Sequence, residues 1–138
     1  MIVIAVSAVS ISISGCTGVA HGGASASCAG QVVELEDPAL EPGGVVQLTV
    51  DWMWTTCEDT GGTSRPAEDV TVTITSSASG ERFLLGRPTP TGPRSTVSGA
   101  FDLPEELPVG AAVVSVRSHD GDRAGADLAV TVGPRRPS

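Results

Sequence analysis

The chain has 138 residues and a net charge of −8, and all eight of its basic side chains are arginines. This length suits a single domain. The acidic charge argues against nucleic acid as a partner and against electrostatic docking on anionic lipids, so any membrane association must be hydrophobic. Because the chain has only two Trp, two Phe and no Tyr, we expect Val, Ala, Leu and Ile to form the core.

The first stretch, residues 2–13, is apolar and uncharged and alternates Ile, Val and Ala with Ser. Such a stretch is too short to cross a bilayer as a helix, which needs about 20 residues. Its length suits the hydrophobic region of a signal peptide. The alternative is a buried strand, which the same alternation also fits.

The segment Ile13-Ser14-Gly15-Cys16 places an aliphatic residue and two small residues directly before a cysteine. This order resembles the bacterial lipobox, and the lysine-free composition rich in Ala, Gly, Val and Pro resembles that of proteins from GC-rich bacteria such as actinomycetes. The resemblance implies that residues 1–15 are a cleaved signal peptide and that Cys16 receives a diacylglyceryl group. Two acyl chains anchor a protein stably, which predicts a lipid-anchored protein on the extracellular face of the cell membrane. No Arg or Lys precedes the apolar run, a departure that an upstream start codon or a weak export signal would explain.

Residues 16–30 form a segment rich in Gly, Ala and Ser with almost no hydrophobic pattern. This composition predicts a flexible tether that keeps the folded domain clear of the membrane. His21 lies in this segment without ligand-type neighbours, so we expect it to be solvated.

Three cysteines are an odd number for an exported protein. With Cys16 lipidated, Cys28 and Cys57 remain as one pair, and an oxidising exterior permits a disulfide between them. Closing that loop of about 30 residues would stabilise the domain by roughly 3–4 kcal/mol in the chain-entropy model. The alternatives are two buried free thiols or a metal site, although neither cysteine has the nearby Cys or His residues that zinc sites use.

From residue 31 on, short β-branched runs alternate with turn residues, which predicts an all-β sandwich or barrel. The loop at residues 87–93 contains three prolines and cannot pair inside a sheet. The tail at residues 134–138 is expected to be disordered. No helix is expected, and the seven predicted strands cover residues 31–36, 45–52, 68–75, 82–85, 95–103, 111–117 and 126–132.

Alternation with period two assigns side chains to faces in two of these runs. It directs Trp52 toward the core, exposes Met53 and leaves Trp54 inward or at the rim. The two tryptophans are either a core plug or an aromatic binding patch, because Trp is enriched at binding hot spots. The expected core faces consist of Val46, Leu48 and Val50 in one run and of Val70, Val72 and Ile74 in the other.

Residues 40–50 resemble the P-G-x-x-V-x-V opening of bacterial Ig-like domains, and residues 99–114 resemble their later G-x-F-x-x-x-x-x-x-P-x-G-x-x-x-V stretch. The resemblance implies an immunoglobulin-like β-sandwich over residues 31–133. It also implies that Phe101 and Val113 fill the core and that a turn at Pro108 and Gly110 leads into the penultimate strand. The insert between Trp54 and Pro66 departs from the family pattern. These motifs mark a fold and not an activity.

No catalytic set is visible in the sequence. A serine nucleophile lacks its G-x-S-x-G elbow, and a blue-copper site would need two histidines where the domain has only His119. The simplest interpretation of His119 is that it is a solvated turn residue. Asp120 and Asp122 flank Gly121 and offer oxygen ligands for Ca²⁺, but Asp-Gly is also an ordinary hairpin signal.

The sequence therefore predicts a non-enzymatic lipoprotein with no cofactor and no metal. Its Ig-like domain would be a binding or structural module at the cell envelope, with an envelope protein or a glycan as partner. The alternative is a small metal- or ligand-carrier lipoprotein that uses the acidic loop at residues 119–122.

Overall fold

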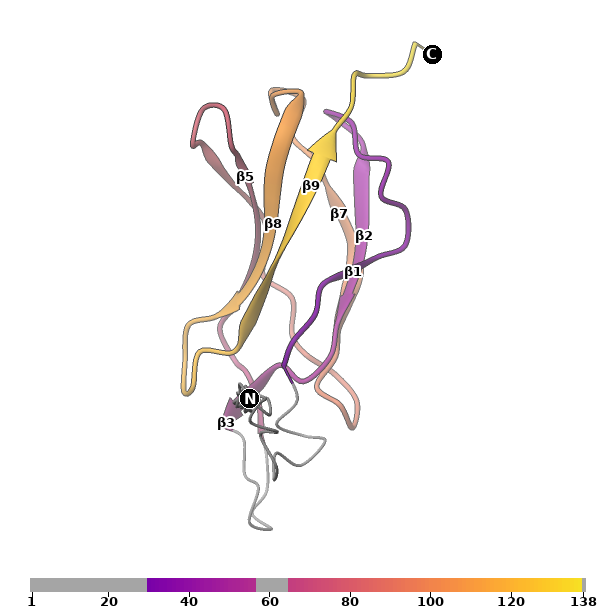
Figure 1. The fold of residues 1–138 in the computed structure, drawn as a ribbon. Helices are drawn as coiled ribbons and strands as arrows, with labels where there is room; N and C mark the ends of the chain where they lie inside the picture. The colour runs from indigo at the N-terminus through magenta and orange to yellow at the C-terminus, as the bar shows by residue number, and fades with distance from the viewer. Residues whose placement is uncertain (1–29, 57–64, 138) are drawn as a thin grey trace, which may run out of the picture.

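The computed structural model describes residues 30–56 and 65–137. These residues form nine strands and no helix, which confirms the predicted all-β class. All pairings between the strands are antiparallel. The strands group into sheets of four, three and two strands, and the two larger sheets lie face to face in Figure 1.

The larger layer is a four-stranded sheet in the order β6-β5-β8-β9. Its central strands pair from Val70 opposite Ser118 to Ser76 opposite Ala112. All four strands were predicted from the β-branched runs in the sequence, with ends that differ by a few residues. Their bounds are β5 Val70–Ser76, β6 Arg82–Gly86, β8 Gly110–Ser118 and β9 Gly125–Val132.

The opposing layer is a three-stranded sheet in the order β1-β2-β7, formed by β1 (Glu34–Leu35), β2 (Val45–Val50) and β7 (Val97–Asp102). Strand β2 pairs with β7 along its whole length. The first strand is shorter than the predicted residues 31–36, because only Glu34 and Leu35 are in register with β2, opposite Thr49 and Leu48. This sheet is therefore narrower than the one it covers.

A small two-stranded sheet of β3 (Trp54–Thr56) and β4 (Arg65–Pro66) was not predicted. It raises the strand count from seven to nine among the described residues. Neither strand has a β-branched apolar run, so the sequence pattern gave no signal for them. They flank residues 57–64, and Cys57 therefore lies outside the described residues, as do Cys16 and Cys28.

The core lies between the two larger sheets and is aliphatic, as composition predicted. The predicted alternation in β2 and β5 is confirmed, because every second residue of these strands is buried. Burying one such side chain contributes about 1.5–3 kcal/mol. The largest fully buried side chains are Met53, Ile74, Val46, Val50, Val70, Val72, Val97, Val114, Val116 and Val132.

Two core assignments implied by the Ig-like resemblance differ in the structure. Val113 faces away from the core, because the alternation in β8 buries Ala112 and Val114 instead. Phe101 lies at the edge of the core and is only half-buried. A β-carbon at Gly86 would lie 2.8 Å from its ring, so the ring covers the end of β6.

The alternation predicted through residue 54 breaks at Trp52. Trp52 has a φ of 67°, so the chain leaves the extended conformation there and the period of two shifts. The prediction that Met53 is exposed is therefore wrong, since its side chain is 0 % exposed. Trp54 points inward and is 9 % exposed, while Trp52 is half-buried.

The two ends of the described chain lie at opposite poles of the domain. Gly30 lies at the pole of β3, whereas residues 133–137 leave β9 at the other pole (Figure 1). The last residues contact the segment before β2, where Gly133 donates its backbone N–H to the Leu40 carbonyl at 2.8 Å. Arg136 donates its backbone N–H to the Glu41 carboxylate at 3.0 Å.

Candidate functional site

Trp52 and Trp54, for which the sequence left a core plug and an aromatic patch as alternatives, lie against each other at the pole of β3. The ring centroids of the two indoles are 6.4 Å apart and their planes meet at 33°. This separation lies within the range of favourable aromatic pairs. Trp54 is packed inward and supports Trp52, whose indole is partly accessible to solvent.

Backbone hydrogen bonds fix the unusual conformation of Trp52. Its N–H donates to the Arg94 carbonyl at 2.7 Å, and its carbonyl accepts the Gln31 side-chain amide at 2.8 Å. The next residue, Met53, donates its N–H to the Ser95 carbonyl at 3.1 Å. The segment before β1, the turn at Trp52 and the loop before β7 are thus joined at one point.

The backbone is strained on both sides of this junction. Trp52 has a φ of 67° and Ser95 a φ of 44°, in a region that bulky residues rarely adopt. The indole N–H of Trp54 and the hydroxyl of Ser95 are buried without a hydrogen-bond partner among the described residues. A buried unsatisfied polar group costs about 1–3 kcal/mol. Strain of this kind gathers at functional sites.

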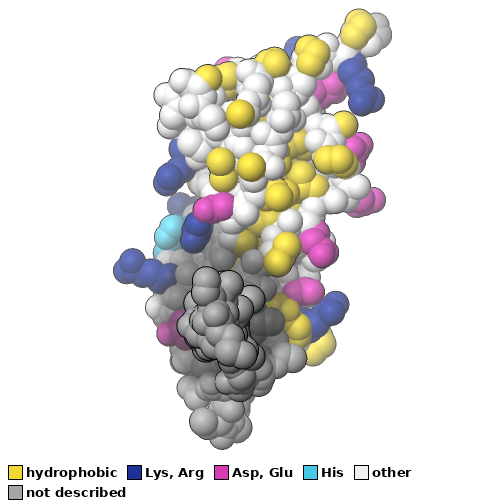
Figure 2. All heavy atoms as spheres, viewed as in Figure 1, with side chains coloured by type: hydrophobic (Ala, Val, Ile, Leu, Met, Phe, Trp, Pro, Cys, Tyr) yellow, Lys and Arg dark blue, Asp and Glu magenta, His cyan; other side chains and the backbone are white. Residues whose placement is uncertain are grey.

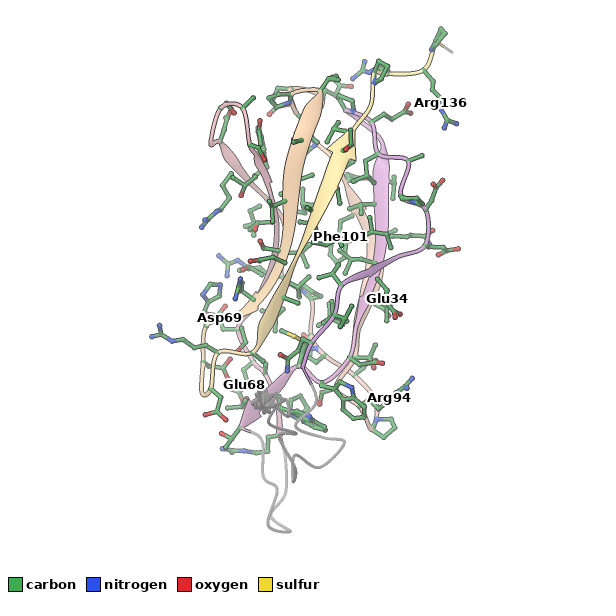
Figure 3. The ribbon with its side chains drawn as sticks, in the orientation of Figure 1. Glu34, Glu68, Asp69, Arg94, Phe101 and Arg136 are labelled. Carbon is green, nitrogen blue, oxygen red and sulfur yellow. The ribbon has the colours of Figure 1, made fainter. Side chains whose placement is uncertain are left out.

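A shallow hollow of about 180 Å³ lies beside Trp52 and is lined also by Glu34, Thr49 and Asp51. Asp51 accepts a hydrogen bond from the Thr96 hydroxyl at 2.6 Å and lies 3.6 Å from the guanidinium of Arg94. Figure 3 shows Arg94 at this pole, below Glu34. The hollow therefore places Trp52 beside polar groups, and its volume is below the roughly 300–1,000 Å³ of usual small-molecule pockets.

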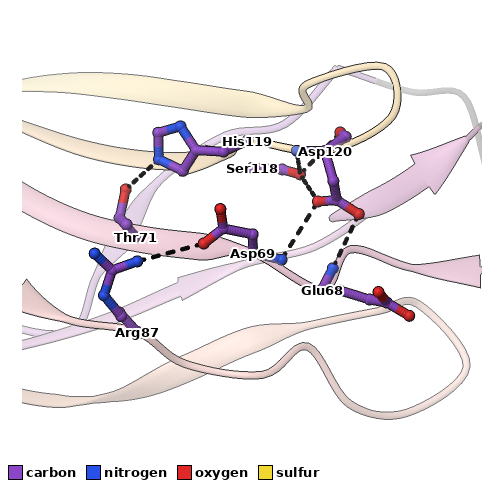
Figure 4. A network of polar contacts seen from close by, with 7 residues as sticks. All are labelled: Glu68, Asp69, Thr71, Arg87, Ser118, His119 and Asp120. Atoms are coloured by element: carbon purple, nitrogen blue, oxygen red, sulfur yellow. Dashed lines mark hydrogen bonds and ion pairs between the residues drawn. The ribbon is translucent and has the colours of Figure 1, made fainter.

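A second polar cluster, at residues 118–120, lies where the loop between β8 and β9 meets the start of β5 (Figure 4). The Asp120 carboxylate accepts a hydrogen bond from the Ser118 hydroxyl at 2.6 Å. It also accepts the backbone N–H groups of Glu68 and Asp69, both at 3.3 Å. The hydroxyl of Thr55 lies 3.0 Å from the same carboxylate.

These contacts lower the pKa of Asp120 from the ordinary 3.8 to about 2. The hydrogen bond from Ser118 is the largest cause, and the partial loss of solvent opposes it. The backbone N–H groups of Glu68 and Asp69 and the Thr55 hydroxyl lower the pKa further. Asp120 is thus held ionised and connects the loop to β3 and to the start of β5.

The neighbours of Asp120 are also engaged in polar contacts. The imidazole Nε2 of His119 lies 2.8 Å from the Thr71 hydroxyl of β5, so the expectation that His119 is simply solvated is incomplete. The Asp69 carboxylate lies 3.3 Å from the guanidinium of Arg87. Both contacts extend the cluster along the outer face of the four-stranded sheet (Figure 4).

The acidic loop at residues 119–122 was the candidate for Ca²⁺. The carboxylate of Asp120 has about four acceptor positions, and the Ser118 hydroxyl and the backbone N–H groups of Glu68 and Asp69 occupy three of them. The single proton of the Thr55 hydroxyl is shared between this carboxylate and the Pro66 carbonyl, which lies 2.8 Å away. Within the described ranges, no group of three or more His, Cys, Asp or Glu residues is arranged to bind a metal ion. The geometry assigns the Asp120 side chain a structural part.

The sequence identified the tryptophans but not the groups that position them. The turn at Trp52 is contacted by Gln31, Arg94 and Ser95, which lie 21 to more than 40 residues away in the sequence. Contacts over such separations leave no local sequence pattern from which they could be predicted. The positive φ of Trp52 had no sequence signal either, because Trp is not a residue associated with that conformation.

Neither protein-family models nor curated proteins match this chain. The part of the chain that the structure describes has no helix long and apolar enough to span a membrane.

Proposed function

We propose that the chain is a lipoprotein anchored at Cys16 on the extracellular face of the cell membrane, with an Ig-like β-sandwich that acts as a non-catalytic binding module. The order of apolar run, small residues and Cys16 supports the anchor. Two antiparallel sheets packed face to face support the Ig-like assignment. The partner is an envelope protein or a glycan.

The strained junction at Trp52 is the observation that carries the binding proposal. A bulky residue with positive φ costs about 1–3 kcal/mol and persists only where its surroundings impose it. Here, hydrogen bonds from Gln31 and to Arg94 impose it, and the result is a rigid, partly accessible indole beside a polar hollow. Rigid Trp side chains of this kind are common binding hot spots.

The position of the patch restricts its partners. It lies at the pole of Gly30, where the tether joins the domain. A tether covering residues 17–30 reaches at most about 50 Å when fully extended. The patch would therefore meet molecules close to the membrane surface or within the inner part of the cell envelope.

The anchor is tested by the fractionation of cells that express the full chain. Cys16→Ala removes the thiol that accepts the lipid, so the protein should move from the membrane fraction to the soluble fraction. Ser14→Ala is the matched control, because it keeps a small residue before Cys16. If Cys16→Ala fractionates like the control, the anchor is refuted.

A disulfide between Cys28 and Cys57 forms part of the proposal. Gln31, which follows Cys28 by three residues, donates its side-chain amide to the carbonyl of Trp52, which precedes Cys57 by five residues. This hydrogen bond brings the chain segments next to the two cysteines together. Mass spectrometry of the unreduced protein should find a peptide that joins Cys28 to Cys57. Two alkylatable thiols at these positions would overturn the pairing.

The binding role is tested with photo-crosslinking in intact cells. Trp52→Ala should remove crosslinked products, because the truncation takes away the accessible ring of the patch. Val109→Ala is the control, since Val109 is 56 % exposed and lies in the turn before β8, outside the patch. Equal crosslinking by both variants would contradict a binding role for Trp52.

A further inference from the structure

The free edge of β9 is the feature from which this inference starts. β9 is the outermost strand of its sheet, and among the described residues its outer side meets only Leu40, at Val132. The N–H of Gly133 points to Leu40, away from β8. By alternation, the amides of Thr131 and Ala129 point to the same free side. An unpaired edge of this length is a template for another strand.

An apolar groove lies beside this edge. The opposing strand β1 has only two residues, so it leaves the inner side chains of β9 half-covered. Figure 2 shows the resulting hydrophobic strip between the two sheets. The groove has a volume of about 480 Å³ and is lined by Leu35, Pro38, Leu128, Ala129, Val130 and Thr131.

The rim of the groove is acidic. Glu34, Glu36 and Asp37 are exposed along β1 and the loop after it, and none of them pairs with a cation within the described ranges. The one charge on β9, Asp127, is paired with Arg117 of β8. An occupant therefore meets apolar side chains in the groove and uncompensated negative charge at its border.

We propose that this groove accepts an extended, basic segment of a partner protein, which adds as a strand to the edge of β9. Backbone hydrogen bonds to the free amides and carbonyls provide affinity, and alternate apolar side chains of the segment enter the groove. Lys or Arg side chains on the segment face Glu34, Glu36 and Asp37. This inference does not depend on the role of Trp52, although Glu34 lines the hollow beside that residue as well as the border of the groove.

Charge selects this occupant over a second copy of the chain. Each copy has a net charge of −8 and would bring the same acidic rim toward the interface. Like charges placed together at an interface oppose association. A basic segment avoids that repulsion, because its Lys or Arg side chains can pair with Glu34, Glu36 and Asp37.

The test uses the full chain purified in detergent and the peptide Ac-Lys-Val-Thr-Val-Thr-Val-Lys-NH₂ with a fluorescent label. Fluorescence anisotropy should show binding that is at least about tenfold tighter than that of the same peptide with Glu in place of Lys. High salt should reduce this difference. Methylation of alternate backbone amides of the peptide should abolish binding. Hydrogen exchange should show new protection at residues 125–131.

Two variants locate the binding to the groove. Ala129→Pro removes an outward N–H without removing a bond to β8, and Val130→Lys places a cation in the groove. Both should weaken binding at least about tenfold, whereas Leu84→Lys, on the far edge strand and 54 % exposed, should not. Equal binding of the acidic peptide, or no protection of β9, would overturn the proposal. Protection that rises with protein concentration in the absence of peptide would also overturn it, in favour of a second copy.

Discussion

Gly121 lies against the backbone carbonyl of Thr55, so closely that a β-carbon at position 121 would overlap with that oxygen. The next residue, Asp122, donates its backbone N–H to the same carbonyl at 2.7 Å. The loop between β8 and β9 is thereby attached to β3, the strand that begins with Trp54. A contact between residues distant in sequence thus helps to position the aromatic patch.

Gly121→Ala should destabilise the fold by about 2 kcal/mol or more. The φ of 55° at this position disfavours any side chain by about 1–2 kcal/mol, and the overlap with Thr55 adds to that cost. Gly80→Ala is the matched control, because Gly80 has a φ of 71° but open space around it. Urea denaturation gives the two free energies of unfolding, and equal losses would show that Thr55 does not restrict this site.

The ionised Asp120 should make stability depend on acid. Its pKa is about 2 in the folded chain against an ordinary 3.8, so its contribution is present above pH 4. That contribution is lost as the pH falls from about 4 to about 2, when the carboxylate becomes protonated in the folded state. Asp120→Asn should therefore lower the free energy of unfolding at pH 7, with a deficit that shrinks toward pH 2.

Ser118→Ala tests the stated cause of this pKa. It removes the largest stabilising hydrogen bond to the carboxylate, so it should reduce the acid dependence of the stability without abolishing it. Urea denaturation at a series of pH values from 7 to 2 measures both variants. A deficit that stays constant over this range would show that the ionisation of Asp120 is not linked to folding.

Met53→Ala should cost about 2–5 kcal/mol, the range for truncating a large buried side chain. Met53 is 0 % exposed although the alternation of the sequence predicts an exposed position. Val109→Ala, at an exposed apolar position, should change the free energy of unfolding by less than about 0.5 kcal/mol. If Met53→Ala lowered the free energy of unfolding as little as Val109→Ala, Met53 would be exposed, as the alternation in the sequence predicts.

Trp52→Gly should be less destabilising than Trp52→Ala. Both variants lose the indole, but glycine adopts the φ of 67° without the cost of about 1–2 kcal/mol that a β-carbon brings. The difference between their free energies of unfolding therefore measures the strain at this position. If alanine were the more stable of the two, the conformation of Trp52 would not be imposed by its surroundings.

The regular strands of the fold could be predicted because their signal is local. Val70, Val72 and Ile74 alternate with threonines, and a strand with one buried face produces that pattern directly. The prediction failed at Met53, because one residue with positive φ reverses the faces of those that follow. Strands β3 and β4 were missed because their pairing depends on distant contacts and not on an apolar run.

The candidate site was predictable only in its aromatic residues. Two tryptophans in a chain so poor in aromatic residues are conspicuous in the sequence. Asp120 accepts hydrogen bonds from Thr55 and Glu68, which lie 65 and 52 positions away in the sequence. No rule of sequence spacing predicts such contacts. Asp120 therefore resembled a calcium ligand in the sequence, whereas its contacts give it a structural part.

The bridge between Leu40 and Val132 has a mechanical consequence. The two segments run parallel at this bridge. The chain before Leu40 comes from the pole of β3, whereas the chain after Val132 leaves at the opposite pole. A pull between Gly30 and Gly133 would slide these segments past each other, and the hydrogen bond from Gly133 to Leu40 would resist that shear. Leu40 and Val132 are also both buried, so sliding them would expose apolar surface to water. A pull at Gly30 would first load the hydrogen bond from Gln31 to Trp52 and the pairing of β1 with β2, and the bridge at Leu40 would be the last of these contacts to bear the force.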